Sequence, residues 1–197
     1  MNAEIKILRN EATPALQSLS LCLAPARRRP FCTVLGRKLE GIYRAWFRSR
    51  DSDSPNRMGW PRQHFWSRIA KATAFDPSQT TDARAVVVIS DPAIGMKVTG
   101  GTIRAKQAKF LAIPLRPEAY GVRPSARTIP GIFFVRSKGA NGGFLAAREG
   151  KALRVYWRLV AKVTQQADPR ALPPQGEVAS QLLRTADAFV ARTLARP

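Results

Sequence analysis

The sequence predicts an α+β fold with N-terminal helices, a small antiparallel sheet and a C-terminal helix. Apolar residues recur with helical spacing up to about residue 75, alternate with polar residues from 83 to 165, and recur with helical spacing again near the C-terminus. Because helices and strands occur in separate blocks, this order favours α+β. We expect one domain over 1–197, with a mainly helical part at 1–75, the antiparallel sheet at 83–165 and a closing helix at 177–195.

A short strand and a helix are expected before residue 25. Residues 4–9 alternate apolar and polar side chains, which predicts the strand. Thr13 is suited to cap a helix and Pro14 to occupy its first position, so we expect a helix that ends before Pro25.

The clearest helix is predicted over residues 33–49. Its apolar side chains recur at intervals of three and four residues and form one stripe, which consists of Leu35, Leu39, Ile42, Tyr43, Trp46 and Phe47. Three arginines, Arg37, Arg44 and Arg48, fall on the opposite side. This basic side is either a solvated face or a face for a polyanion or partner, and both interpretations stay open.

The stretch NRMGWPRQHFW, residues 56–66, overlaps the end of a polar loop at 50–59. Pro61 predicts the start of a second helix that continues to about residue 74, and Trp60 is expected to pack back on its first turn. His64 is the only histidine of the chain. With no second histidine and no GxSxG motif, we expect a packing or hydrogen-bonding role for it rather than catalysis.

From residue 83 the hydrophobic pattern has a period of two. The paired glycines at 100–101 indicate a turn or bulge, and Pro114 places one strand end at a sheet edge or at a strand terminus. Long loops are expected near 116–130 and 137–143. The expected strands cover residues 85–90, 108–115, 132–136, 144–148 and 153–163.

The strand at 153–163 is predicted to have one apolar and one basic face. The apolar face would carry Leu153, Val155, Trp157, Leu159, Ala161 and Val163. The wet face would carry Arg154, Tyr156, Arg158, Val160 and Lys162. We therefore expect one side of this strand to lie on a core and the other to be exposed and basic.

The strongest compositional signal is positive charge. The chain has 33 Lys and Arg against 13 Asp and Glu, a formal net charge of +20. A field of this strength favours polyanions or a strongly acidic partner surface. The candidate partner- or DNA-binding residues lie on the predicted basic faces; they are Arg37, Arg44, Arg48, Arg104, Lys106, Lys109, Arg154, Arg158 and Lys162.

Few signs of catalysis or of a membrane are present. We expect no metal and no cofactor, because one histidine and the separated Cys22 and Cys32 match no zinc pattern. Cys22 and Cys32 are expected as thiols, with a disulfide as the alternative.

Glu149 and Lys151 resemble half of a nuclease motif, and a metal-dependent nuclease is therefore a remote third hypothesis for the function. The chain has no run of eighteen apolar residues that would predict a membrane span, so we expect a cytosolic product.

Three stretches carry a resemblance to a known class of proteins. They are PNRMGWPRQHFWSRIAKAT (55–73), GGTIRAKQAKFLAIPLRPEAYG (100–121) and FLAAREGKALRVYWRL (144–159). With the order of elements over most of residues 1–195, they resemble phage and prophage virion-morphogenesis proteins of the tail-completion or head–tail neck kind. The resemblance implies a structural protein without enzymatic activity, so no catalytic residue is carried over.

The same resemblance implies partners and a location. Such proteins form rings, so we expect this chain to bind copies of itself, portal, adaptor or tail-tube proteins, and, in one version, DNA without sequence preference. It would reside in the virion and, during assembly, in the bacterial host cytoplasm. The alternative is a cytosolic basic nucleic-acid-binding protein of a mobile element. A ring would multiply weak attractions between each subunit and an acidic neighbour. The long loops at 50–59, 116–130 and 137–143 would then be contacts between subunits, with ordinary surface loops as the alternative.

Overall fold

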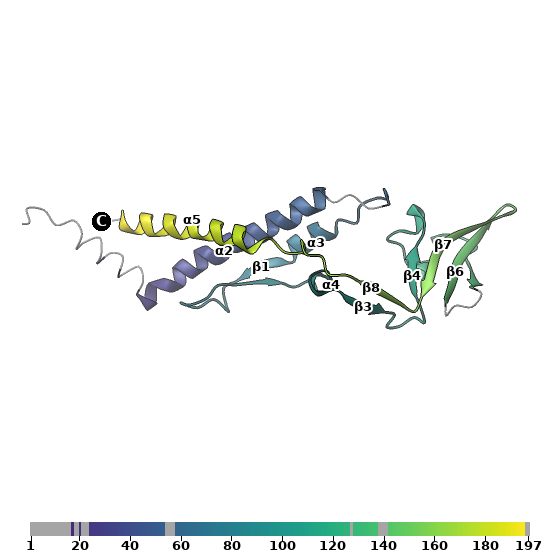
Figure 1. Cartoon of the computed structure of the whole chain (residues 1–197), viewed down its shortest axis with the longest axis horizontal. Helices are drawn as coiled ribbons and strands as arrows, with labels where there is room; N and C mark the ends of the chain where they lie inside the picture. The colour runs from purple at the N-terminus through teal and green to yellow at the C-terminus, as the bar shows by residue number, and fades with distance from the viewer. Residues whose placement is uncertain are drawn as a thin grey trace, which may run out of the picture. The chain divides into compact units, whose positions relative to one another are not determined.

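A computed structural model describes residues 24–53, 58–126, 128–137 and 142–195, together with positions 17 and 20. It confirms the α+β class, with helices in the N-terminal part, small antiparallel sheets and a C-terminal helix (Figure 1). The strand predicted at 4–9 and Cys22 lie outside the described residues. So does most of the helix that was predicted to begin at Thr13. Among the helices that the structure describes, none has both the length and the apolar character needed to cross a membrane.

The chain divides into two compact units, which we describe one at a time. Unit 1 takes the described parts of residues 1–49, 66–91 and 172–197, and unit 2 takes 50–65 and 92–171. The expected helical part, sheet part and closing helix do not coincide with these units, because the first hairpin and the closing helix both belong to unit 1. The single-domain organisation stays a prediction.

Helix α2, Pro25–Asp53, is the longest element and begins eight residues before the predicted helix. Pro25 occupies its first position, where a missing N–H costs nothing, so this proline starts the helix. Ile42 and Phe47 of the predicted apolar stripe are buried, and Phe47 is fully enclosed. Cys32 is a buried free thiol, and burial raises its pKa.

Helix α3, Phe65–Lys71, is shorter than the predicted helix at 61–74. His64 has a left-handed backbone conformation, with φ of 50°, and this interrupts helical geometry directly before Phe65. At the other end, the buried Thr73 already belongs to a strand. Trp66 is buried and stacks on Phe47 with 5.9 Å between ring centroids, so α3 is anchored through Trp66.

Trp60 has an aromatic partner outside α3. Its ring contacts Tyr120 in edge geometry at 5.4 Å, within unit 2. The first turn on which Trp60 was expected to pack begins at Phe65, four residues later than Pro61 suggested.

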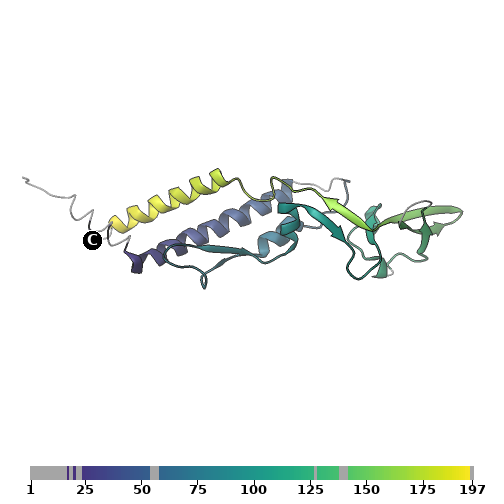
Figure 2. The ribbon, with the colours of Figure 1, turned by 60° about the horizontal axis from the view of Figure 1, so that its bottom comes forward.

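A hairpin of β1, Thr73–Asp76, and β2, Val86–Ile89, follows α3 in unit 1. The residues of β1 were predicted to belong to the helical part, and that prediction was wrong because they form a strand. Strand β2 confirms the strand predicted at 85–90. The hairpin lies along α2, where Gly36 leaves room for the Phe75 ring (Figure 2).

The closing helix α5, Gln175–Leu194, confirms the helix predicted at 177–195 and also lies along α2 (Figure 2). The rings of Phe31 on α2 and Phe189 on α5 meet with 5.2 Å between centroids. No described side chain of α5 is fully buried, and Leu183 is 64% exposed. The contact between these helices is therefore only partly closed.

The second segment of unit 2 starts with helix α4, Ala93–Thr99, which the sequence did not predict. Gly100 and Gly101 have φ of 68° and 140°, and so form the expected turn between α4 and β3, Gly101–Arg104. Strand β3 pairs antiparallel with β8, Lys162–Gln165, to form a separate two-stranded ribbon. The predicted sheet part thus contains a helix and more than one sheet.

The four-stranded sheet of unit 2 has the order β4-β7-β6-β5, with every neighbouring pair antiparallel. Its buried residues Ala147, Tyr156 and Trp157 form a core with Ala119, and Val122 and Ile129 pack against this core; Ala119, Val122 and Ile129 lie in the loop after β4. That loop contains the short 3₁₀ turns η1, Pro117–Ala119, and η2, Pro124–Ala126. The strands span Leu111–Pro114 (β4), Phe133–Arg136 (β5), Gly142–Glu149 (β6) and Ala152–Val160 (β7).

A β-bulge overturns the predicted faces of β7. Trp157 pairs with Leu145 and Val155 with the next residue of β6, so Tyr156 is an extra residue without a partner. As a result Tyr156 and Trp157 are both buried, at 6% and 1% exposure, whereas Leu153 is 53% exposed. The prediction placed Leu153 on the core and Tyr156 in water, and it was wrong because a bulge shifts the alternation by one residue.

Candidate functional site: a basic surface with one closed and one open end

The structure distributes the predicted basic residues over both units. On α2, Arg37 and Arg48 are exposed, with no carboxylate partner among the described residues. In unit 2, exposed basic residues lie on β3, β7 and β8 and in the segment between β3 and β4; they are Arg104, Lys106, Lys109, Arg158 and Lys162. Two of the predicted residues, Arg44 and Arg154, form ion pairs with acidic residues of the same unit.

Arg44 lies in a polar contact of unit 1. It pairs with Glu40, one helical turn earlier on α2, at 2.9 Å, and its Nε donates to the main-chain oxygen of Thr73 at 2.9 Å. The side chain is 36% exposed. Arg44 therefore connects α2 to the start of β1. The prediction that Arg44 lies on a free basic face was wrong, because its guanidinium is already bound.

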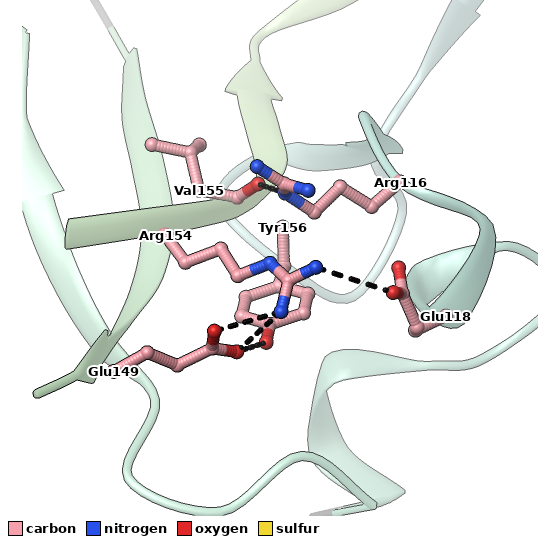
Figure 3. Close-up of polar contacts among 6 residues, drawn as sticks. All are labelled: Arg116, Glu118, Glu149, Arg154, Val155 and Tyr156. Atoms are coloured by element: carbon pink, nitrogen blue, oxygen red, sulfur yellow. Dashed lines mark hydrogen bonds and ion pairs between the residues drawn. The ribbon is translucent and has the colours of Figure 1, made fainter. Parts of the chain in front are cut away.

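Arg154 lies in a polar network at the β6–β7 turn (Figure 3). Its guanidinium donates to both carboxylate oxygens of Glu149 at 2.7 Å, and lies 3.6 Å from Glu118. The Tyr156 hydroxyl donates to Glu149 at 2.9 Å, and Arg116 Nε donates to the main-chain oxygen of Val155 at 3.1 Å. We call these residues the polar network. Arg154 was assigned to a free basic face, and it is instead bound by two carboxylates.

The network holds its members in definite charge states. Hydrogen bonds from Arg154 and then from Tyr156 lower the pKa of Glu149. The hydrogen bond to Glu149 and the burial of the ring raise the pKa of Tyr156. The bond with Glu149 also raises the pKa of Arg154. Glu149 thus remains a carboxylate with its oxygens occupied, and is poorly suited to exchange protons near neutral pH.

The nuclease hypothesis requires acids around a metal ion. Across the described residues, no three histidine, cysteine or acidic side chains gather closely enough to hold one. The Glu149 oxygens accept hydrogen bonds from Arg154 and Tyr156, and Glu118 faces the same arginine. This geometry gives the resemblance of Glu149 and Lys151 to a nuclease motif no further support.

His64 is bound by an acid, as a hydrogen-bonding role would require. Its Nδ1 lies 2.8 Å from Asp51 Oδ2, and the main-chain oxygen of Asp51 accepts a hydrogen bond from Arg62 at 2.9 Å. The imidazole is 67% exposed. These contacts fix the segment that leads into α3.

The β3–β8 ribbon places like charges opposite each other. Arg104 on β3 pairs directly with Lys162 on β8, and both side chains are exposed. Like charges at directly opposed positions destabilise a strand pair. No acidic residue occurs in 101–116 or 150–167 to offset this repulsion. The ribbon is therefore a place where an external anion would be stabilising.

A second basic feature lies at the end of the four-stranded sheet away from the β6–β7 turn. A hollow of about 760 Å³ opens there, and we call it the basic hollow. Its lining comes from the start of β6, the ends of β5 and β7, and the residues before β4; it consists of Lys109, Phe110, Phe134, Arg136, Gly142, Leu159 and Ala161. Of these, only Lys109 was a predicted site residue.

The remaining lining residues were missed because their sequence signals have ordinary explanations. Phe134 and Arg136 were assigned to a plain strand, and Gly142 to the tip of a loop. A pair of glycines at a strand start, opposite a strand with an aromatic residue, was the available signal. Its meaning depends on the pairing of β5 with β6, which periodicity does not provide.

Comparisons with known proteins provide no relative. A scan against protein-family models, a search of curated proteins and a search of solved structures each found no match for this chain.

Proposed function

We propose that this chain is a non-enzymatic structural subunit of a phage or prophage virion, of the head–tail neck or tail-completion kind, and that it assembles as a ring. The proposal is supported by the resemblance of residues 55–73, 100–121 and 144–159 to such proteins. It is also supported by the order of the elements, with a long helix first, small antiparallel sheets next and a closing helix last.

The observation that carries the proposal is the incomplete packing of α5 on α2 in unit 1. Two hollows of about 680 and 500 Å³ lie between these helices. Phe189 of α5 is only half-buried, and Leu183 is largely exposed. We infer that a neighbouring subunit covers these apolar side chains, as neighbouring subunits do where an exposed apolar patch marks an interface.

The exposed basic residues suit the partners of such a ring. An acidic surface on a portal, adaptor or tail-tube protein, or the phosphates of DNA in a central channel, would neutralise them. Because a ring presents the same charges several times, weak attraction at each subunit adds up to strong attachment. In this proposal the protein resides in the virion and passes through the host cytoplasm during assembly.

The test is the mass of the purified protein in solution, measured by light scattering after size exclusion over a range of concentrations. We expect a defined multiple of the 21.7 kDa chain. Leu183→Lys should shift the protein toward monomer, because it places a charge on the uncovered face of α5. The matched control is Leu153→Lys, which changes an exposed leucine of unit 2 and should leave the mass unchanged.

A wild-type protein that stays monomeric at all concentrations would contradict the proposal. If that monomer also bound DNA with steep salt dependence, the alternative of a basic nucleic-acid-binding protein would replace it. A ring that persists in Leu183→Lys would show that α5 is not the assembly surface.

A further inference from the structure

The basic hollow combines cations, aromatic rings and a floor of small residues. Phe134 is 51% exposed, so a large part of its ring is available to a ligand. The Lys109 ammonium lies 5.7 Å from the centroid of the neighbouring Phe110 ring. Arg136 is exposed on the same strand as Phe134. A volume of about 760 Å³ is within the range of about 300–1,000 Å³ that is usual for ligand sites.

Two glycines shape the floor of the hollow. A Cβ at Gly143 would lie 2.6 Å from the Phe134 ring, so this ring packs directly on the backbone of β6. A Cβ at Gly142 would collide with the main-chain oxygen of Leu159 on β7. Glycine at both positions lets the strands approach and leaves room above them, as is common where a ligand or ring comes close to a backbone.

The charges around the hollow are not compensated from within. The segments that form its walls, residues 101–116, 131–137, 142–148 and 150–167, contain no Asp or Glu. The acids Glu118 and Glu149 of unit 2 are held in the polar network, at the other end of the β6–β7 pair. Lys109 and Arg136 therefore have no described carboxylate partner, and an anion from outside would fit.

We propose that the basic hollow binds single-stranded nucleic acid. An unpaired base would stack on Phe134, and the flanking phosphates would contact Lys109 and Arg136. Single strands offer unstacked bases and phosphates together, which is the combination that a basic groove with exposed aromatic rings recognises. A duplex keeps its bases stacked inside, and an acidic peptide supplies charge without an aromatic plane of this kind.

This inference does not depend on assembly, because the hollow lies within one unit of one chain. A protein that forms rings without binding single strands would contradict only the inference. A monomer that binds them through the hollow would contradict only the proposed ring.

The first experiment measures fluorescence anisotropy of labelled dT12 with the full chain. Phe134→Ala should weaken binding by at least about fivefold, since stacking of one base contributes about 1–3 kcal/mol. Phe133→Ala is the matched control: it removes the neighbouring ring on the opposite face of β5 and should leave binding unchanged. Phe134→Leu, which keeps apolar volume without an aromatic plane, should weaken binding as well.

The second experiment measures how dT12 binding depends on salt. Lys109→Gln combined with Arg136→Gln should flatten the slope of log K against log salt by about 1.4, which corresponds to two lost phosphate contacts. The control is Lys71→Gln combined with Arg84→Gln, which removes one lysine and one arginine from exposed positions of unit 1. That control has the same net charge and should keep the wild-type slope.

Competition decides the class of ligand. Unlabelled dT12 or rU12 should displace the probe. The competitor that displaces it at the lower concentration shows whether the hollow prefers DNA or RNA. A 12-base-pair duplex or a polyglutamate peptide of similar charge should compete much less. If duplex or polyglutamate competes equally, or if Phe134→Ala binds dT12 like wild type while its circular dichroism is native, the hollow does not recognise single strands.

Discussion

The two ends of the β6–β7 pair use the same kinds of residue in opposite ways. At the turn, Arg154 and Tyr156 both bond to Glu149, so charge and aromatic hydroxyl are satisfied inside the polar network. At the other end, Arg136 and Phe134 line the basic hollow and remain exposed. An arginine beside an aromatic residue is thus a structural contact in one place and an uncovered surface in the other.

The difference comes from where the few acids of the chain lie. Unit 2 has two carboxylates near the β6–β7 turn, Glu118 and Glu149, and its strands carry none toward the hollow. In a chain with a net charge of +20, most basic residues have no acid to pair with. The position of each acid therefore decides which cations are available to a partner.

The largest expected effect concerns the core below the polar network. Trp157 is 1% exposed, and Trp157→Ala should lower the free energy of unfolding by about 3–5 kcal/mol in urea denaturation. Leu159→Ala, two residues along the same strand and in the partly exposed floor of the hollow, should cost clearly less. Equal losses would mean that the hollow is packed as tightly as the core, which would remove the contrast between the two ends.

An intermediate effect is expected at the floor of the hollow. Gly143→Ala would force its new methyl group against the Phe134 ring and the main-chain oxygen of Val135, and should destabilise the protein by about 1–3 kcal/mol. The control is Gly176→Ala in the first turn of α5, where nothing lies within 4 Å of the added carbon. An unaffected Gly143→Ala protein would show that Phe134 does not rest on β6.

The smallest effect is a shift in titration within the polar network. Tyr156 has a raised pKa because its neutral hydroxyl donates to the Glu149 carboxylate, and an ionised phenolate would face that negative charge. Glu149→Gln removes the charge, so the pKa of Tyr156 should fall toward the ordinary tyrosine value. Ultraviolet absorbance of the phenolate against pH measures this shift, and an unchanged titration would mean that the two groups do not interact in solution.

Elements with strong periodicity could be predicted from the sequence. The apolar stripe of α5 placed that helix to within two residues at its start, and the valine-rich run placed β2. Helix α4 could not be predicted in this way, because Gly95 and Val98 are weak helix formers. Its stability comes from tertiary contacts, including buried Ile94 and a hydrogen bond from Asp168 N to Lys97 O at 2.8 Å.

The candidate site was predicted only in part. Composition identified the basic character, and alternation identified exposed cations such as Arg158 and Lys162. Whether an individual arginine is paired depends on residues distant in sequence, as with Arg44 and the main-chain oxygen of Thr73. The hollow itself arises from strand pairing and two glycines, so local pattern alone could not reveal it.

The unpaired residue at position 156 has a consequence for how this strand can evolve. One additional amino acid puts the odd-numbered side chains of β7 on different sides before and after it, so Leu153 meets solvent while Leu159 supports the cavity floor. Deleting that single residue would restore a regular ladder and leave the side chains before and after it on their present faces, because their partners on β6 stay the same, but it would remove the Tyr156 hydroxyl from Glu149. Inserting or deleting a residue elsewhere in β7 would instead turn all side chains beyond the change to the opposite face, and would disrupt the polar network or the basic hollow.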